Sequence, residues 1–242
     1  MSDEQPTVEP TPSADSTSML AAVIICCYTD RRWDVLTQSI ESVTSQLEPA
    51  DALVVVVDYN PSLEARLRSR YPKLTVLPNE EPKGLSGARN TGLSAVTQDV
   101  VLFLDDDAVA RPGWLKTYRE AFSSDGRLVA AGGSILAWWE VEEPAWFPAE
   151  FGWVVGCDYI GLPPNMMPIR NPIGASMAVR RRPTAAVGGF SHELGRVNDL
   201  PAGCEETELS IRLRKAHPDA HIVRLTAAVV DHLVPADRGR IG

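Results

Sequence analysis

Three short apolar runs, separated by helical patterns, constrain the fold of this chain more than any other feature. The runs are rich in β-branched residues and span 20–27 (LAAVIICC), 52–57 (ALVVVV) and 100–104 (VVLFL). Such runs are typical of strands that are buried on both faces of a parallel sheet. Between them, apolar residues recur at helical spacing in 34–47, 62–71 and 84–98, and 73–78 has a short strand pattern. This alternation predicts an α/β domain with a mostly parallel central sheet flanked by helices.

The pattern changes after residue 128. Segments 128–138 and 174–181 have strand patterns, and 203–216 has a helical stripe with two glutamates in its first turn. We expect two late strands, at 221–225 and 227–235. Between the first two segments, four of the six tryptophans fall within 138–153, a stretch with neither a helical nor an alternating period.

The composition fits one soluble domain and excludes several classes of function. The chain has 242 residues, 44% of them hydrophobic, and a net charge of −9, which makes nucleic acid an unsuitable partner. No segment reaches the roughly 18 apolar residues of a membrane span. The four cysteines form no CxxC pair, which favours reduced thiols in a cytoplasmic protein. We expect a disordered tail at 1–18 and a second tail at 236–242 that continues in a longer natural chain.

Three consecutive aspartates follow the third apolar run. Alternation along an extended strand would place Asp105 and Asp107 on one face, about 6.8 Å apart, and Asp106 on the other. At an effective dielectric constant near 20, the same-face pair costs roughly 2–3 kcal/mol if both carboxylates are ionised and unpaired. Water at a solvated strand end or a bound cation would offset this cost. Because ligands bind at the carboxyl ends of parallel strands, the aspartates mark a candidate site.

The motifs occur in an order that resembles a known family. VVVVD at 54–58, GLSGARN at 84–90, FLDDDA at 103–108, EETELSIRL at 205–213 and a late histidine follow one another along the chain. This order resembles the family 2 inverting nucleotide-sugar glycosyltransferases, over roughly residues 20–235. The resemblance implies a single domain of the GT-A-type (Rossmann-like) fold. Residues 19–127 would form the nucleotide-sugar donor-binding half, and 128–235 the acceptor-binding and catalytic half.

The same resemblance implies a metal-dependent transfer of a sugar, with inversion, from a nucleoside-diphosphate sugar to an acceptor hydroxyl. A UDP-sugar is the favoured donor, and Mn²⁺ or Mg²⁺ would bridge the acidic protein and the diphosphate. The implied metal ligands are Asp107, Asp105 and His232. The implied donor-binding residues are Tyr28, Thr29, Asp30, Arg31, Asp58, Gly84, Ser86, Arg89, Asn90, Asp105 and Asp106. For Arg89, a salt bridge that supports the aspartates and a direct donor contact are both open.

By the resemblance, the general base is the second acid of the glutamate pair, Glu206, with Glu205 as the alternate. On residues alone, acids in a first helical turn equally complement the helix dipole. Trp138, Trp139 and Trp146 are candidates for an acceptor platform, and core packing is the competing explanation. The acceptor is a saccharide, a lipid-linked or a small molecule, and a lipid-linked one would bring the protein to the inner membrane face. The alternative function is a catalytically silent nucleotide- or glycan-binding domain of the same fold.

Overall fold

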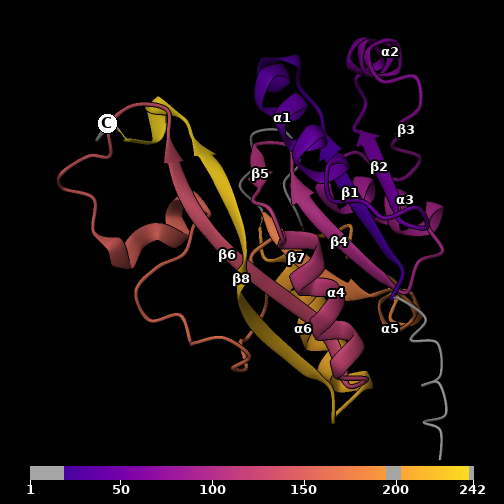
Figure 1. Ribbon diagram of the computed structural model, residues 1–242, viewed down its shortest axis with the longest axis vertical. Helices are drawn as coiled ribbons and strands as arrows, with labels where there is room; N and C mark the ends of the chain where they lie inside the picture. Colours follow the sequence, from indigo (N-terminus) through magenta and orange to yellow (C-terminus); the bar gives the residue numbers. More distant parts are fainter. Residues whose placement is uncertain (1–18, 195–202, 240–242) are drawn as a thin grey trace, which may run out of the picture.

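A single eight-stranded sheet forms the centre of the molecule. The computed structural model describes residues 19–194 and 203–239, and its strands follow the order β3-β2-β1-β4-β7-β6-β8-β5 (Figure 1). The strands are β1 Ala21–Cys27, β2 Ala52–Val57, β3 Thr75–Pro78, β4 Val100–Asp105, β5 Ala108–Ala110, β6 Leu128–Trp139, β7 Ser176–Arg180 and β8 His221–Val234. The α-helices are α1 Trp33–Thr44, α2 Pro61–Arg70, α3 Leu85–Ala95, α4 Trp114–Ser124, α5 Arg181–Ala186 and α6 Glu205–Ala216. The 3₁₀ helices are η1 Asp30–Arg32, η2 Ala149–Val155 and η3 Ala236–Gly239.

The first half of the chain has the predicted parallel arrangement. The three apolar runs form β1, β2 and β4, which pair in parallel with β1 in the centre, and β3 extends the sheet beyond β2. The carboxyl ends therefore meet at one edge: Cys26 is in register with Asp105, and the Asp58 amide donates to the Cys27 carbonyl at 2.7 Å.

The second half makes the sheet mixed. β7 lies antiparallel between β4 and β6, β8 pairs in parallel with β6, and β5 is antiparallel to β8. Four pairings are thus parallel and three antiparallel. Three of the four parallel pairings join the strands β1 to β4, which come from the segments where the sequence predicts a parallel sheet. The expectation of two late strands was wrong. β8 is continuous, and the break in its pattern is a register shift beside Gly133 and Ser134.

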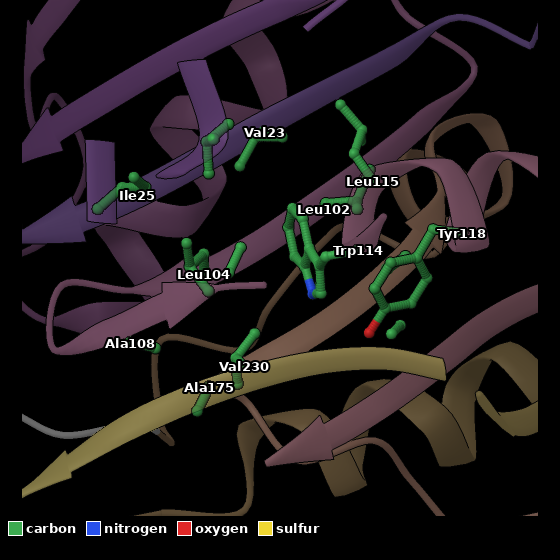
Figure 2. Close-up of a cluster of buried hydrophobic side chains, with 14 of the residues drawn as sticks. Val23, Ile25, Leu102, Leu104, Ala108, Trp114, Leu115, Tyr118, Ala175 and Val230 are labelled. Carbon is green, nitrogen blue, oxygen red and sulfur yellow. The ribbon is translucent and has the colours of Figure 1, made fainter. Parts of the chain in front are cut away.

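Both faces of the sheet are buried, as the unbroken apolar runs predict. Side chains of β1 alternate between a cluster that includes α1 and α4 and a second cluster that includes α3 and α6. Figure 2 shows Trp114 of α4 next to Leu102 and Leu104 of β4, with Tyr118 on the other side of Trp114. Their polar atoms are satisfied by one residue, because Trp114 Nε1 donates to Ser176 Oγ and Tyr118 Oη to the Ser176 carbonyl, both at 2.9 Å. This packing holds β4 and β7 in place beneath the site.

The two predicted tails differ in what the structure describes. Residues 1–18 and 240–242 lie outside the described residues, whereas 236–239 form η3. Among the described helices, none combines the length and the apolarity that crossing a bilayer requires.

Candidate active site

An open cavity of about 620 Å³ lies at the carboxyl ends of β1, β2 and β4. Its walls come from both halves of the chain: the strand ends, the start of α3, the end of η2, the start of α6 and the end of β8. Its described lining includes six carboxylates against four arginine or lysine side chains. The cavity is therefore acidic, and an anionic ligand needs further positive charge to bind there.

The aspartate run forms one side of this cavity. Asp105 ends β4, and Asp106 and Asp107 make the turn into β5. Because β5 pairs with β8 with Ala108 opposite His232, the histidine reaches the run. Ligand atoms of Asp105, Asp107 and His232 lie within 4.8 Å of one another, and His232 Nε2 is 3.2 Å from Asp107 Oδ1. The predicted grouping of these three side chains is confirmed.

Arg32, which the sequence did not identify as a site residue, also contacts the aspartate run. Arg32 Nη1 lies 2.6 Å from Asp106 Oδ1 and 2.8 Å from Asp107 Oδ2. Arg32 is 74 residues from Asp106 along the chain, and only the step from η1 into α1 brings it to the cavity. No local pattern distinguishes Arg32 from its exposed neighbour Arg31, so no sequence signal could have identified it.

Burial and the neighbouring charges shift the pKa values of the three aspartates in different directions. Burial raises the pKa of Asp105, with Arg89 opposing, and burial together with the Asp107 charge raises the pKa of Asp106 to about 7. Burial would also raise the pKa of Asp107, but the hydrogen bond from His232 and the charges of His232 and Arg32 hold it below its ordinary value. Burial disfavours the imidazolium of His232, yet its bond to Asp107 raises the pKa to about 10. Asp107 is thus the carboxylate of the run that stays ionised most readily.

The glutamate pair faces the aspartates across a buried arginine. Arg89 Nη1 contacts Glu205 Oε1 at 2.8 Å, while Glu206 Oε1 is 3.8 Å away and Asp105 Oδ1 is 3.5 Å from Nη2. The Glu205 side chain is 5% exposed and that of Glu206 16%. A Cβ at Gly174 would come within 2.2 Å of Glu206 Oε1 and 2.7 Å of Arg89 Nη2, so a larger residue there would displace these two side chains. Arg89 therefore forms its closest salt bridge with Glu205 and a longer one with Asp105, and a direct donor contact stays a prediction.

Glu206 is the more exposed carboxylate of this pair. Burial raises its pKa to about 7, with Arg89 opposing the rise and Glu205 adding to it. A carboxylate with a pKa near neutrality in a cavity is suited to accept a proton.

Of the other predicted donor-binding residues, Asp58 and Tyr28 line the cavity. The Gly84 amide donates to both carboxylate oxygens of Asp58, at 3.2 and 3.1 Å, and Asn79 Nδ2 donates to one of them at 2.6 Å. Gly84 has φ of 130°, a conformation that favours glycine, and it places its amide toward Asp58 as α3 begins.

Besides Gly84, five predicted donor-binding residues do not line the cavity. Ser86 Oγ donates to the Leu194 carbonyl, and the Asn90 amide bonds the backbone of Phe190 in both directions. Thr29 caps η1, and Asp30 accepts from Asn60 Nδ2 at 3.0 Å. Arg31 is exposed. The geometry gives these side chains roles in holding loops, and their donor contacts stay predictions.

The three tryptophans that are candidates for an acceptor platform lie outside the cavity lining. Trp138 and Trp146 are exposed and Trp139 packs on Phe147, and none of the three lines the cavity. Trp153, which projects from η2 and is 58% exposed, does line it. Trp138 and Trp139 end β6, which does not line the cavity, whereas η2 lies at the cavity rim and carries Trp153. Without a periodic pattern in 138–153, the sequence could not identify the tryptophan at the rim.

The protein thus has an α/β fold with a mixed sheet, and acids from the strand ends, a histidine from β8 and the glutamate pair of α6 surround one cavity. The family model described as Glycosyl transferase family 2 matches residues 22–183. The chain therefore belongs to glycosyl transferase family 2.

This chain spans only part of the length of each protein to which it is similar. It is 33% identical over 198 residues to the glucosyl-dolichyl phosphate glucuronosyltransferase of Haloferax volcanii, covering 81% of this chain and 63% of the relative. The crystal structure of GalNAc-T7 with UDP, GalNAc and Mn²⁺ matches with a TM-score of 0.68 at 16% identity, over 91% of this chain and 45% of that one. The mannosyltransferase PcManGT from Pyrobaculum calidifontis, in complex with GDP-Man and Mn²⁺, matches with a TM-score of 0.61 at 19% identity, over 89% and 57%. These two likenesses confirm the predicted GT-A-type fold.

Proposed function

We propose that this chain is a metal-dependent inverting glycosyltransferase that moves a sugar from a UDP-sugar to an acceptor hydroxyl. The observation that carries the proposal is one cavity that holds both the Asp105–Asp107–His232 cluster and Glu206. The first is suited to bind a metal and a diphosphate, and the second is suited to deprotonate an acceptor. Membership of the family supports glycosyl transfer as the reaction class.

The three clustered side chains fit a divalent cation. Two carboxylates and one imidazole, with ligand atoms within 4.8 Å of one another, are the donor set that Mn²⁺ accepts, and Mg²⁺ would use mainly the carboxylates. When bound, the ion would neutralise charge on the departing diphosphate. The Mn²⁺ in the complexes of both structural neighbours supports this assignment.

Glu206 is the proposed general base. Its carboxylate would take the proton of the acceptor hydroxyl while that oxygen bonds to the anomeric carbon and the bond from this carbon to the diphosphate oxygen breaks. One displacement of this kind inverts the anomeric configuration. Glu205 is less suitable, because Arg89 holds it at 2.8 Å and its side chain is buried. We assign Glu205 to positioning Arg89, and through it Glu206.

Asp58 is the proposed reader of the nucleotide base. It lines the cavity at the end of β2, and its oxygens are held in place by the Gly84 amide and Asn79. A carboxylate accepts the imide N–H of uracil, and this favours UDP over nucleotides without that donor.

The proposed acceptor is a lipid-linked saccharide. The similarity to the glucosyl-dolichyl phosphate glucuronosyltransferase of Haloferax volcanii supports this class. The rim of the cavity also suits an acceptor with an apolar part, since Phe151, Trp153 and Val154 of η2 are each about half exposed there or beside it. Such an acceptor would bring the protein to a membrane surface, in line with the expected peripheral location.

The experiment is release of free nucleoside diphosphate from a panel of UDP-sugars and GDP-sugars, with Mn²⁺, with and without a polyprenyl-phosphate-linked monosaccharide. We expect acceptor-dependent release from a UDP-sugar, and a product of inverted anomeric configuration by NMR. Donor binding without release for any pair would instead favour the silent binding domain. The Glu206→Gln variant is the matched control, since it should bind the donor and release little diphosphate.

A further inference from the structure

Arg32 occupies an unusual position for a cavity-lining cation, because it is bound to two of the three aspartates. Its side chain is 24% exposed and lines the cavity, while the side chains of Asp106 and Asp107 are 5% and 8% exposed. The Asp106 contact is the shorter, at 2.6 Å against 2.8 Å. The backbone of the run is fixed as well, since Ser39 Oγ donates to the Ala108 carbonyl. Arg32 therefore meets a rigid pair of carboxylates.

Asp107 is fully engaged in this arrangement. Arg32 holds its Oδ2 and His232 lies 3.2 Å from its Oδ1. A cation that binds Asp107 must compete with Arg32 for the same carboxylate, and the arginine charge also repels it at short range. Metal binding alone is therefore opposed by Arg32.

Arg32 no longer opposes metal binding at Asp107 if it has another anion to bind. A guanidinium offers five N–H donors in a planar fork, which matches phosphate oxygens as well as carboxylates. The other cavity-lining arginine on this side, Arg89, is 2% exposed at its side chain and is held by Glu205. Among the described residues, Arg32 is the partly exposed cavity-lining arginine that forms salt bridges with Asp106 and Asp107.

We propose that Arg32 is an exchangeable counter-ion that couples the binding of the metal to the binding of the donor diphosphate. This inference rests on the proposed function. In the free protein Arg32 neutralises Asp107. When Asp107 binds a divalent cation, Arg32 keeps its bond to Asp106, and its released N–H groups bind the diphosphate in the cavity. Each ligand then strengthens the other, and neither fills the site well by itself.

The test is a thermodynamic cycle measured by calorimetry: Mn²⁺ alone, UDP alone, and each in the presence of the other, for wild type and Arg32→Gln. For Arg32→Gln we expect Mn²⁺ alone to bind about fivefold more tightly, because the competing charge is gone. UDP at saturating Mn²⁺ should bind about tenfold more weakly while UDP alone stays near wild type, so the coupling factor falls about tenfold, equivalent to about 1.4 kcal/mol. Arg70→Gln is the matched control, since Arg70 also pairs with a carboxylate, Glu41 at 3.7 Å, but on the surface of α2. Its four affinities should equal those of wild type.

Arg32→Lys keeps the charge and loses the fork, and it serves as a second variant if Arg32→Gln folds poorly. We expect it to retain the weak binding of Mn²⁺ alone and to lose about threefold of the coupling. Equal weakening of Mn²⁺ and UDP in Arg32→Gln, with the coupling factor unchanged, would make Arg32 a structural residue and overturn the inference alone. Absence of any Mn²⁺-dependent UDP binding in wild type would overturn the proposed function and the inference together.

Discussion

Replacement of Glu206 by glutamine removes the proposed proton acceptor with almost no change in shape. The carboxylate is partly accessible from the cavity, and burial raises its pKa to about 7. Without its base, transfer should fall by roughly 10²–10⁴-fold, the usual contribution of general base catalysis. Binding of Mn²⁺ and UDP should stay near wild type, because Asp105, Asp107 and His232 are untouched.

The raised pKa also predicts how the wild-type rate depends on pH. The base works as the ionised carboxylate, so a pKa near 7 leaves about a tenth of the molecules active at pH 6 and about nine tenths at pH 8. The turnover number at saturating donor should therefore rise about tenfold between these two pH values. In Glu206→Gln this rise should disappear.

The assay is continuous measurement of released UDP, for both proteins, across pH 5.5–8.5. Two results would refute the reasoning: near-wild-type transfer by Glu206→Gln, or a slow variant that keeps the wild-type pH profile. If Glu205→Gln loses the profile instead, the base is Glu205, and the pairing with Arg89 must open during turnover.

Three further predictions concern the neighbouring residues. Asp107→Asn should lose Mn²⁺-dependent UDP binding and transfer together, as measured by calorimetry and UDP release; retention of tight binding would place the metal elsewhere. Asp58→Ala should reduce the preference for UDP over CDP, whose base lacks the imide N–H, by about tenfold in competition binding, since one hydrogen bond to a charged group contributes about 1.5 kcal/mol; an unchanged preference would remove Asp58 from the base pocket. Glu205→Gln should lower the free energy of unfolding in urea by about 2–3 kcal/mol, because it leaves the buried Arg89 charge without its closest partner; the exposed-pair control Glu120→Gln, which removes the partner of Lys116, should lose less than about 1 kcal/mol, and equal losses would contradict a structural role for Glu205.

Local patterns were sufficient to predict the first half of the fold. The unbroken β-branched runs at 20–27, 52–57 and 100–104 could be read as buried strands, because only a sheet covered on both faces buries them fully. The direction of β7 could not be predicted in this way. Its partners, β4 and β6, lie far from it along the chain, and a short apolar run carries no information about which way its neighbour runs.

Some residues of the candidate site could likewise be predicted from the sequence, and others could not. Strand alternation predicted Asp105 and Asp107 on one face, but the strand ends at Asp105, and it is the turn at Asp106 and Asp107 that brings the pair together. The resemblance to the family identified His232. Arg32 and Trp153 could not be found, because their places in the cavity depend on how η1 and η2 return to the sheet. Long-range packing decides such positions, and no short pattern encodes it.

The central claim is that the acidic cavity takes a nucleoside diphosphate through a divalent cation. The direct measurement is a calorimetric titration of the wild-type protein with UDP, once with Mn²⁺ and once with chelator. The cluster of Asp105, Asp107 and His232 among six cavity-lining carboxylates predicts at least about a hundredfold tighter binding with Mn²⁺. Equal affinity in the two titrations would contradict the claim.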